Sequence, residues 1–498
     1  MPKTIEDLKA RLATISDLNA ASLTLTWDRQ TYMPESGVQG RAEQLATLHR
    51  LAHEILISPE TGDLLGALED LDPESEAGAL VKAARRDFDR ATRVPARLVE
   101  ELSRTRSLAE PAWVQAREAS DWEAFAPHLE KLLALQREAA ECRGYEEHPY
   151  DAMLDLFEPG ARKSRVESMF EELKSGVLPL LQRVMAVRDE NRARPLSGEF
   201  DEGRQEEFGK AVITAFGYDW SRGRQDRTIH PFCVGINPGD VRITTRFDPS
   251  RLSTALFATL HESGHGMYEQ GINSAYFRTP LDRGASMGIH ESQSRMWENL
   301  VGRSRPFWQH YYPELQRAFP EVLGATDLET FYRAVNAVEP SEIRVEADEL
   351  TYDLHILLRF ELEVALFEDN LSVAELPAAW NAGMEEYVGV TPGNVARGAL
   401  QDIHWAAGLF GYFPTYTIGN VLSVQLFDAA VEARPGIIED LERGEFQTLL
   451  RWLRENIHFH GCKYDPEDLV RRATGRPLDT ATYLKYLTTK FSDLYEPA

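Results

Sequence analysis

The sequence predicts a mainly α-helical globular fold with one small β-sheet, and three observations lead to it. Apolar residues recur at helical spacing through most of the chain, as at Leu8, Leu12 and Ile15. One stretch, residues 221–247, is instead rich in proline, glycine and β-branched residues. Hydrophobic residues make up 43% and charged residues 27% of the 498 positions, which is the balance of a globular protein and not of a disordered one.

The elements are expected in a simple order along the chain. We expect two helices over residues 4–57 with a turn near 33–37, helices over 58–195 and 205–218, the sheet within 221–247, and helices again from 272 nearly to the end. No internal repeat or low-complexity linker interrupts this order. The sequence therefore predicts a single domain over residues 1–498.

The chain is organised around an H-E-x-x-H motif at residues 261–265. On a helix, residues four apart lie on the same face, so His261 and His265 can offer two imidazole nitrogens to one metal ion. Glu262 lies one position round the helix, where its carboxylate can take a proton from water without replacing a ligand. This division of roles is typical of metal-assisted hydrolysis.

The segments on either side favour a long helix around the motif. Residues 241–247 alternate apolar and polar types, which predicts a strand whose edge could pair with an extended peptide. Asp248 is a suitable N-cap and Pro249 a suitable first helical residue, while Gly271 is a plausible end. One apolar stripe is formed by Leu252, Leu256 and Leu260.

A third metal ligand is expected downstream, because a catalytic zinc usually takes three protein ligands. Residues 288–295 begin another helical stretch, and Glu291 lies in its polar cluster. Glu291 would complete a His-His-Glu set. The alternative is that Glu291 belongs to a solvated helix face.

Composition excludes several other functions. The formal net charge of −26 argues against binding DNA or an anionic membrane surface. The sequence contains no run of about 18 apolar residues, so we expect no transmembrane helix. Residues 1–7 lack the apolar core of a signal peptide. The three cysteines, Cys142, Cys233 and Cys462, are far apart and odd in number, which fits a reducing cytoplasm. Their scarcity also argues against a cysteine-rich, purely structural zinc site.

Taken together, the motifs resemble those of the carboxypeptidase Taq family of zinc metallocarboxypeptidases. They follow one another in the family's order: H-P-F at 230–232, D-V-R-I-T at 240–244, H-E-S-G-H at 261–265, H-E-S at 290–292, I-R-V-E-A-D at 343–348 and G-A-L-Q-D-I-H-W at 398–405. The resemblance implies two helical lobes flanking a deep central groove, similar to neurolysin and angiotensin-converting enzyme. It also implies release of single amino acids from the free C-terminus of peptides, zinc or cobalt as the metal, and a homodimer.

Two arginines compete for the role of holding the substrate's C-terminal carboxylate. A guanidinium suits that role because it can make a two-pronged hydrogen bond. Arg344 lies in a run dense in carboxylates, so its spacing favours a structural ion pair, but the resemblance favours it as the anchor. Arg242 is the rival. His230 is expected either to line the substrate site or to anchor a loop.

An oxyanion donor is needed when water attacks the peptide carbonyl. His404 and Tyr416 are the candidates, at a spacing similar to that in neurolysin-like peptidases, with Tyr412 as the alternative tyrosine. The competing interpretation is an aromatic core. An endo-acting oligopeptidase, which has the same metal chemistry without a carboxylate anchor, also stays open. The histidines expected to be structural are His49, His53, His128, His148, His310, His355, His458 and His460.

Overall fold

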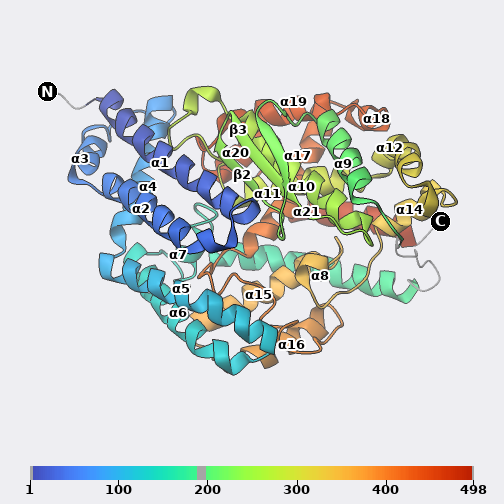
Figure 1. The fold of residues 1–498 in the computed structure, drawn as a ribbon, viewed down its shortest axis with the longest axis horizontal. Coiled ribbons are helices and arrows are strands. Elements are labelled where there is room, and N and C mark those ends of the chain that lie inside the picture. The colour runs from blue at the N-terminus through green and yellow to red at the C-terminus, as the bar shows by residue number, and fades with distance from the viewer. Residues whose placement is uncertain (1–3, 188–197, 496–498) are drawn as a thin grey trace. The chain divides into compact units, whose positions relative to one another are not determined.

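The computed structural model describes residues 4–187 and 198–495 (Figure 1). Helices contain 67% of the residues and strands contain 4%, so the predicted mainly α fold with one small sheet is confirmed. Residues 188–195, at the end of the long helical stretch predicted from the sequence, lie outside the described residues. No helix in the described ranges combines the length and the apolar character needed to cross a membrane.

The chain divides into two compact units, and each is assembled from three separate stretches. Unit 1 comprises Met1–Thr92, Arg194–Val335 and Leu422–Leu478, whereas unit 2 comprises Arg93–Ala193, Asn336–Val421 and Asp479–Ala498. The helix α4 (Glu76–Arg93) ends where unit 1 passes into unit 2, and α17 (Pro414–Ala433) runs from unit 2 into unit 1. The single domain expected over residues 1–498 stays a prediction.

Unit 1 contains the predicted pair of N-terminal helices, the sheet and the motif helix. Besides α4 and the later part of α17, its helices are α1 (Ile5–Thr31), α2 (Val38–Leu56), α3 (Pro59–Ala67), α9 (Glu202–Phe216), α10 (Leu252–Gly271), α11 (Met287–Arg295), α12 (Arg305–Ala318), α13 (Pro320–Leu323), α14 (Leu328–Val335), α18 (Ile437–Glu442), α19 (Gln447–Asn456) and α20 (Pro466–Thr474). A capping box begins α1, because Thr4 Oγ1 accepts from the Asp7 backbone N–H and Asp7 accepts from the Thr4 N–H. The predicted turn near 33–37 separates α1 from α2.

The sheet of unit 1 has three strands in the order β1-β3-β2. These are β1 (Gly223–Arg227), β2 (Cys233–Asn237) and β3 (Asp240–Thr245). β3 pairs in parallel with β1 and antiparallel with β2. The strand predicted at 241–247 is therefore present, but it covers Asp240–Thr245 and ends two residues early. The expectation that its edge could pair with a peptide is wrong, because β1 and β2 are already hydrogen-bonded to its two edges.

The motif helix α10 begins three residues later than predicted. Asp248 does not cap it, because the Asp248 carboxylate instead accepts from the backbone N–H and hydroxyl of Ser250 in a turn before the helix. Arg251 occupies the N-cap position without a side-chain cap. The predicted end at Gly271 is confirmed, and the stripe of Leu252, Leu256 and Leu260 is buried.

Two glycines inside the motif let α10 pack closely on both sides. A Cβ on Gly264 would lie 2.6 Å from the carbonyl oxygen of Gln293, so a side chain there would push α11 away. A Cβ on Gly266 would lie 2.8 Å from the Tyr218 ring and 3.3 Å from Ile243 of β3. Glycine at these two positions therefore allows α11 and the sheet to approach α10, and the first approach brings Glu291 to the histidines.

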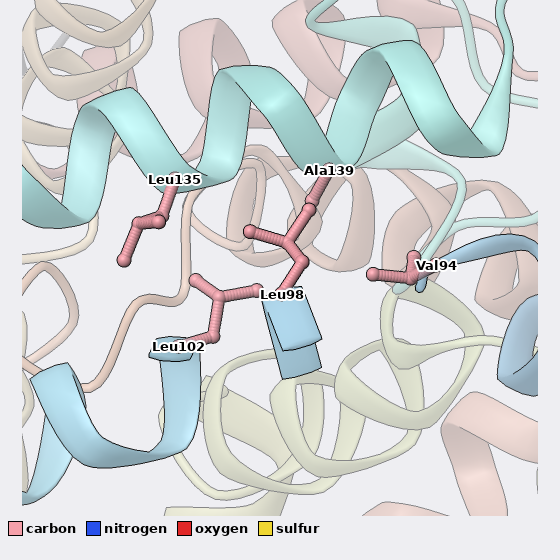
Figure 2. Packing of buried hydrophobic residues seen from close by; sticks show 5 residues of the cluster. All are labelled: Val94, Leu98, Leu102, Leu135 and Ala139. Carbon is pink, nitrogen blue, oxygen red and sulfur yellow. The ribbon is translucent and has the colours of Figure 1, made fainter. Parts of the chain in front are cut away.

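Unit 2 is helical among the residues that the structure describes. Its helices are α5 (Ala96–Ala119), α6 (Trp122–Arg143), α7 (Asp151–Leu154), α8 (Lys163–Val187), α15 (Tyr352–Phe367), α16 (Leu376–Tyr387) and α21 (Thr480–Tyr495). Figure 2 shows part of its core, where side chains of α5, together with Val94 two residues before it, pack against α6. The five residues, Val94, Leu98, Leu102, Leu135 and Ala139, are at most 6% exposed. Burying each leucine contributes about 1.5–3 kcal/mol.

A buried carboxylate ties three parts of unit 2 together. Glu363 in α15 is fully buried, and it accepts hydrogen bonds from the Tyr150 hydroxyl at 2.6 Å, the Trp405 indole N–H at 2.8 Å and the Gly411 backbone N–H at 2.8 Å. Burial raises the pKa of Glu363 to about 7 against the opposing effect of these donors. Its three hydrogen bonds join α15 to segments far away in the sequence.

Removing this carboxylate is expected to destabilise unit 2 strongly. Glu363→Ala leaves three buried donors without their acceptor, and we expect a loss of about 3–5 kcal/mol in the free energy of unfolding. Urea unfolding followed by tryptophan fluorescence measures the effect as a lower midpoint. Glu130→Ala, which changes an exposed glutamate of α6, is the control. Equal midpoints for the two variants would show that the Glu363 bonds add no net stability.

Candidate active site

Three potential metal ligands meet in unit 1. His261 and His265 project from α10, and Glu291 projects from α11; one donor atom from each lies within 4.8 Å of the others. Glu291 Oε2 is 3.7 Å from His261 Nε2 and 3.5 Å from His265 Nε2. Metal bonds of about 2.0–2.1 Å at tetrahedral angles would separate donor atoms by roughly 3.3 Å. The three residues that the sequence singled out therefore fit one metal ion in number, chemistry and spacing.

The outer nitrogen of His261, which is Nδ1 because Nε2 lies beside Glu291, is held by a carboxylate. His261 Nδ1 lies 2.9 Å from Glu298 Oε2, in a π-helical turn over Met296–Val301 that follows α11. Arg295 and Arg303 contact the same carboxylate at 3.4 and 3.3 Å. A carboxylate on Nδ1 favours the tautomer that carries its proton there, which leaves the Nε2 lone pair facing Glu291.

The outer nitrogen of His265 is held by a third histidine. His265 Nδ1 lies 2.5 Å from His290 Nδ1, and His290 Nε2 lies 2.8 Å from Glu269 Oε1. Glu269 is one helical turn beyond His265 on α10, so the contacts run from α10 to α11 and back to α10. His261 and His265 thus each have a hydrogen-bond partner on Nδ1, as metal-binding histidines usually do.

Glu291 is kept in the charged form that a metal ligand needs. Burial alone would raise its pKa, but Arg295 and the two histidines outweigh burial and hold the pKa of Glu291 well below its usual range. Arg295 Nε donates to Glu291 Oε1 at 2.7 Å, and the Ser294 hydroxyl donates to Oε2 at 3.2 Å. Glu291 is 7% exposed, so the expected alternative of a solvated helix face does not describe it.

Glu262 has a different environment from Glu291. It is 7% exposed, and burial raises its pKa to about 7, with His261 opposing the rise and Glu291 adding to it. Glu262 is not among the three donors that lie within reach of a common ion. A carboxyl group whose pKa is close to neutrality can both accept and release a proton at physiological pH.

Arg344 lies in unit 2 and is paired with a carboxylate distant in sequence. Its Nε and Nη2 donate to Asp402 Oδ1 at 3.0 and 2.8 Å, and its Nη1 donates to the Tyr352 hydroxyl at 3.0 Å. Arg359 donates to the other oxygen of Asp402 at 2.8 Å. The structural ion pair favoured by spacing exists, but its partner is Asp402 and not a glutamate or aspartate of the 339–349 run.

The proposed oxyanion donors, His404 and Tyr416, contact each other in unit 2. His404 Nε2 lies 3.0 Å from the Tyr416 hydroxyl. Burial lowers the pKa of His404 to about 3, so the imidazole is neutral at physiological pH. The Tyr412 ring packs 5.4 Å from the His404 ring and 5.4 Å from the Tyr416 ring. The predicted aromatic cluster is therefore present, and it surrounds a polar pair.

The other two candidates lie in unit 1. Arg242 on β3 makes two hydrogen bonds of 2.7 Å to Asp240, and its guanidinium stacks 4.1 Å from the centre of the Trp27 ring. His230 is exposed in the segment between β1 and β2. Arg242 thus has structural partners of its own, as Arg344 does.

Four residues that had no role predicted from sequence support the candidate site residues within their own units, directly or through a neighbour. Glu298, Glu269 and His290 hold the outer nitrogens of the two histidines, and Asp402 pairs with Arg344. Helical spacing could have predicted that Glu269 lies near His265, because it follows His265 by four residues on the same face of the helix. No spacing rule indicates Asp402, because the pairing depends on how distant segments fold together.

Removing the carboxylate of Glu291, the candidate third ligand, is expected to weaken metal binding. Glu291→Ala should lower the affinity for zinc about 100-fold, because two histidines alone would remain and a charged oxygen is lost. Competition with a chromophoric chelator measures the affinity, and Glu314→Ala, at an exposed site on α12, is the control. Wild-type affinity in Glu291→Ala would mean that a different residue is the third ligand.

Comparisons with known proteins agree with this chemistry. The family model described as carboxypeptidase Taq (M32) metallopeptidase matches residues 7–491. The thermostable carboxypeptidase 1 of Thermus thermophilus is 44% identical over 94% of each chain, and the carboxypeptidase 1 of Bacillus subtilis is 40% identical over 97% of each. The crystal structure of an M32 carboxypeptidase from Deinococcus radiodurans R1 superposes with a TM-score of 0.95 at 42% identity and covers 99% of both chains. The chain therefore belongs to the carboxypeptidase Taq (M32) family of metallopeptidases and is a metal-dependent carboxypeptidase.

Proposed function

We propose that this carboxypeptidase uses a zinc ion bound by His261, His265 and Glu291 to release single amino acids from the free C-terminus of peptides. The observation that carries the proposal is the cluster of three donor atoms within 4.8 Å, with an outer partner on each histidine. Cobalt is the alternative metal. Zinc is preferred because two imidazoles and one carboxylate are the ligand set of many catalytic zinc sites.

The bound metal would supply Lewis acidity, which lowers the pKa of water and polarises the peptide carbonyl. Glu262 takes the proton of the attacking water and passes it to the leaving amine. Two observations support this role: Glu262 is outside the ligand cluster, and its pKa of about 7 suits both proton transfers. No covalent bond between protein and substrate is required.

Arg344 holds the C-terminal carboxylate of the peptide. A guanidinium has five N–H groups, and the contacts to Asp402 and Tyr352 occupy three of them. Asp402 and Arg359 fix the position of the Arg344 side chain, which reduces the entropy that it would lose on binding a substrate. Arg242 remains the rival for this role, and His230 is proposed to line the substrate site.

His404 and Tyr416 steady the oxyanion. Their mutual hydrogen bond of 3.0 Å supports a shared role, since a neutral imidazole can accept from the hydroxyl or donate to it. Tyr416→Phe removes one hydroxyl and is expected to lower kcat about 100-fold, because an oxyanion donor acts mainly in the transition state. The metal affinity should not change. Tyr412→Phe is the matched control, and a larger loss in that variant would transfer the role to Tyr412.

One assay tests the proposal as a whole. Purified enzyme is given an N-blocked dipeptide and a blocked hexapeptide, with and without a chelator, and the products are identified. We expect free amino acids from both substrates, released one after another from the hexapeptide, no release with chelator, and recovery on adding zinc. Internal cleavage of the hexapeptide would favour the oligopeptidase alternative. Recovery of activity with cobalt but not with zinc would show that cobalt, and not zinc, is the metal that the enzyme uses.

The homodimer and the cytoplasmic location stay predictions. Analytical ultracentrifugation of the purified protein tests the first, and a sedimenting species of monomer mass at micromolar concentration would contradict it.

A further inference from the structure

A chain of two hydrogen bonds connects His265 to a carboxylate that does not itself belong to the ligand cluster. It runs from His265 Nδ1 to His290 Nδ1 over 2.5 Å and from His290 Nε2 to Glu269 Oε1 over 2.8 Å. The side chains of His290 and Glu269 are each 18% exposed. Each of these two hydrogen bonds needs a proton on one partner and a lone pair on the other, so the chain constrains where the ring protons lie.

The carboxylate sets the direction of the bond between His290 and Glu269, and the need for a lone pair on His265 Nε2 sets the direction of the bond between His265 and His290. An ionised carboxylate can only accept, so the Glu269 oxygen requires a proton on His290 Nε2. A neutral His290 then carries a lone pair on Nδ1, which accepts the proton of His265 Nδ1. His265 in that tautomer has its own lone pair on Nε2, the atom that lies 3.5 Å from Glu291. With the direction reversed, His265 Nε2 would carry a proton and could not bind a metal.

The surroundings hold this chain in position. The His290 ring packs on the Tyr268 ring with centres 5.1 Å apart, and Tyr268 is anchored where its hydroxyl accepts from the Ala285 backbone N–H at 3.1 Å. A Cβ on Gly284 would lie 2.9 Å from the His290 ring. A Cβ on Gly235 of β2 would lie 2.7 Å from the Glu269 carboxylate. Neighbouring glycines thus leave just enough room for both side chains.

From these contacts we infer that His290 and Glu269 are positioning residues that select the metal-binding tautomer of His265. The inference rests on the proposed function, because it takes His265 as a metal ligand. His261 needs no such relay, since the carboxylate of Glu298 contacts its Nδ1 directly at 2.9 Å. The two ligand histidines would then be oriented by different devices, one with a single link and one with two.

Two substitutions of His290 separate the hydrogen bond from the packing. His290→Phe keeps a ring against Tyr268 but removes the acceptor. His290→Asn loses the ring but can place an amide oxygen close to the position of Nδ1. We expect zinc affinity to fall roughly 10–100-fold in His290→Phe and to stay within about threefold of wild type in His290→Asn. Chelator competition measures both values.

His458→Phe is a matched control for the loss of a buried histidine. The His458 ring also packs on Tyr268 with centres 5.1 Å apart, and its Nε2 bonds to Gln293 at 2.8 Å and not to a metal ligand. Zinc affinity in His458→Phe should match wild type. An equal loss in His290→Phe and His290→Asn, or no loss in His290→Phe, would overturn the tautomer role.

A spectroscopic measurement on the metal-free protein tests the tautomer itself. In protein labelled with ¹⁵N-histidine, long-range correlations show which ring nitrogen carries the proton, and His265→Asn identifies the His265 signals. We expect the proton on Nδ1 in wild type and a population with the proton on Nε2 in His290→Phe and in Glu269→Leu. Unchanged spectra in both variants would overturn the inference. Failure of the ligand set would show separately, as wild-type zinc affinity in Glu291→Ala.

Discussion

Replacing Glu262 with glutamine is expected to lower kcat/KM about 10³–10⁴-fold while zinc affinity stays at the wild-type value. Glutamine has nearly the shape of glutamate but cannot accept the proton of the attacking water, and a positioned general base contributes up to about 10⁴-fold. The metal should be retained because Glu262 is outside the cluster of His261, His265 and Glu291. Steady-state kinetics on a blocked dipeptide and chelator competition measure the two quantities.

The control for this variant is another glutamate of unit 1. Glu206 is half-buried and pairs with Lys210 at 2.6 Å, so Glu206→Gln makes the same chemical change at a paired carboxylate outside the ligand cluster. Its kinetics should match wild type. A Glu262→Gln enzyme that lost its metal would identify Glu262 as a ligand, and one with near-normal turnover would show that another group is the base.

Local patterns predicted the parts of the molecule that depend on local physics. Apolar spacing predicted the helices, and alternation predicted the strand at Asp240–Thr245 within one residue at its start. The spacing of His261 and His265 needed only a helix to bring both rings to one face. Glu291 was a different case: a gap of 25 residues separates it from His265, and no spacing rule links the two. The need for a third ligand, its place in a polar cluster and the resemblance to a family pointed to it.

The errors arose where a second local contact competed with the expected one, or where the outcome depended on how strands assemble. Asp248 has the sequence signature of an N-cap, but Ser250 lies close enough to occupy its carboxylate in a turn. The strand at Asp240–Thr245 was given an open edge, although its neighbours on both sides come from the stretch directly before it, residues 223–237. Sequence periodicity shows which residues form a strand but not its place in the sheet.

The partner of Arg344 illustrates why the site was only partly predictable. Five carboxylates lie within the 339–349 run, yet Arg344 pairs with Asp402, 58 positions downstream. Of those five, Asp348 accepts from the backbone N–H groups of Leu350 and Thr351, and Glu349 pairs with Lys490. Each unit is built from three distant stretches, so a partner such as Asp402 can come from a segment far away in the sequence.

Cleavage at the terminal residue depends on recognising the free C-terminal carboxylate of the peptide. Arg344→Ala is expected to lower kcat/KM on peptides with a free C-terminus roughly 10²–10³-fold, because a charge-assisted, desolvated ion pair is lost. Asp402 keeps a partner in this variant, since Arg359 donates to it at 2.8 Å, so the fold and the zinc affinity should be preserved. Circular dichroism and chelator competition check both.

Substrate chemistry separates an anchor from a structural ion pair. A C-terminally amidated peptide lacks the partner of the guanidinium, so it should be a poor substrate for wild type and lose little more in Arg344→Ala. A merely structural role would instead lower kcat/KM for both peptides by the same factor. Arg242→Ala is the comparison variant, because Arg242 is also an arginine paired with an aspartate, although Arg242 is half-buried and Arg344 is buried. Should Arg242→Ala show the selective loss and Arg344→Ala resemble wild type, the anchor is Arg242. Wild-type cleavage of the amide as fast as the free acid would remove carboxylate recognition as the basis of specificity.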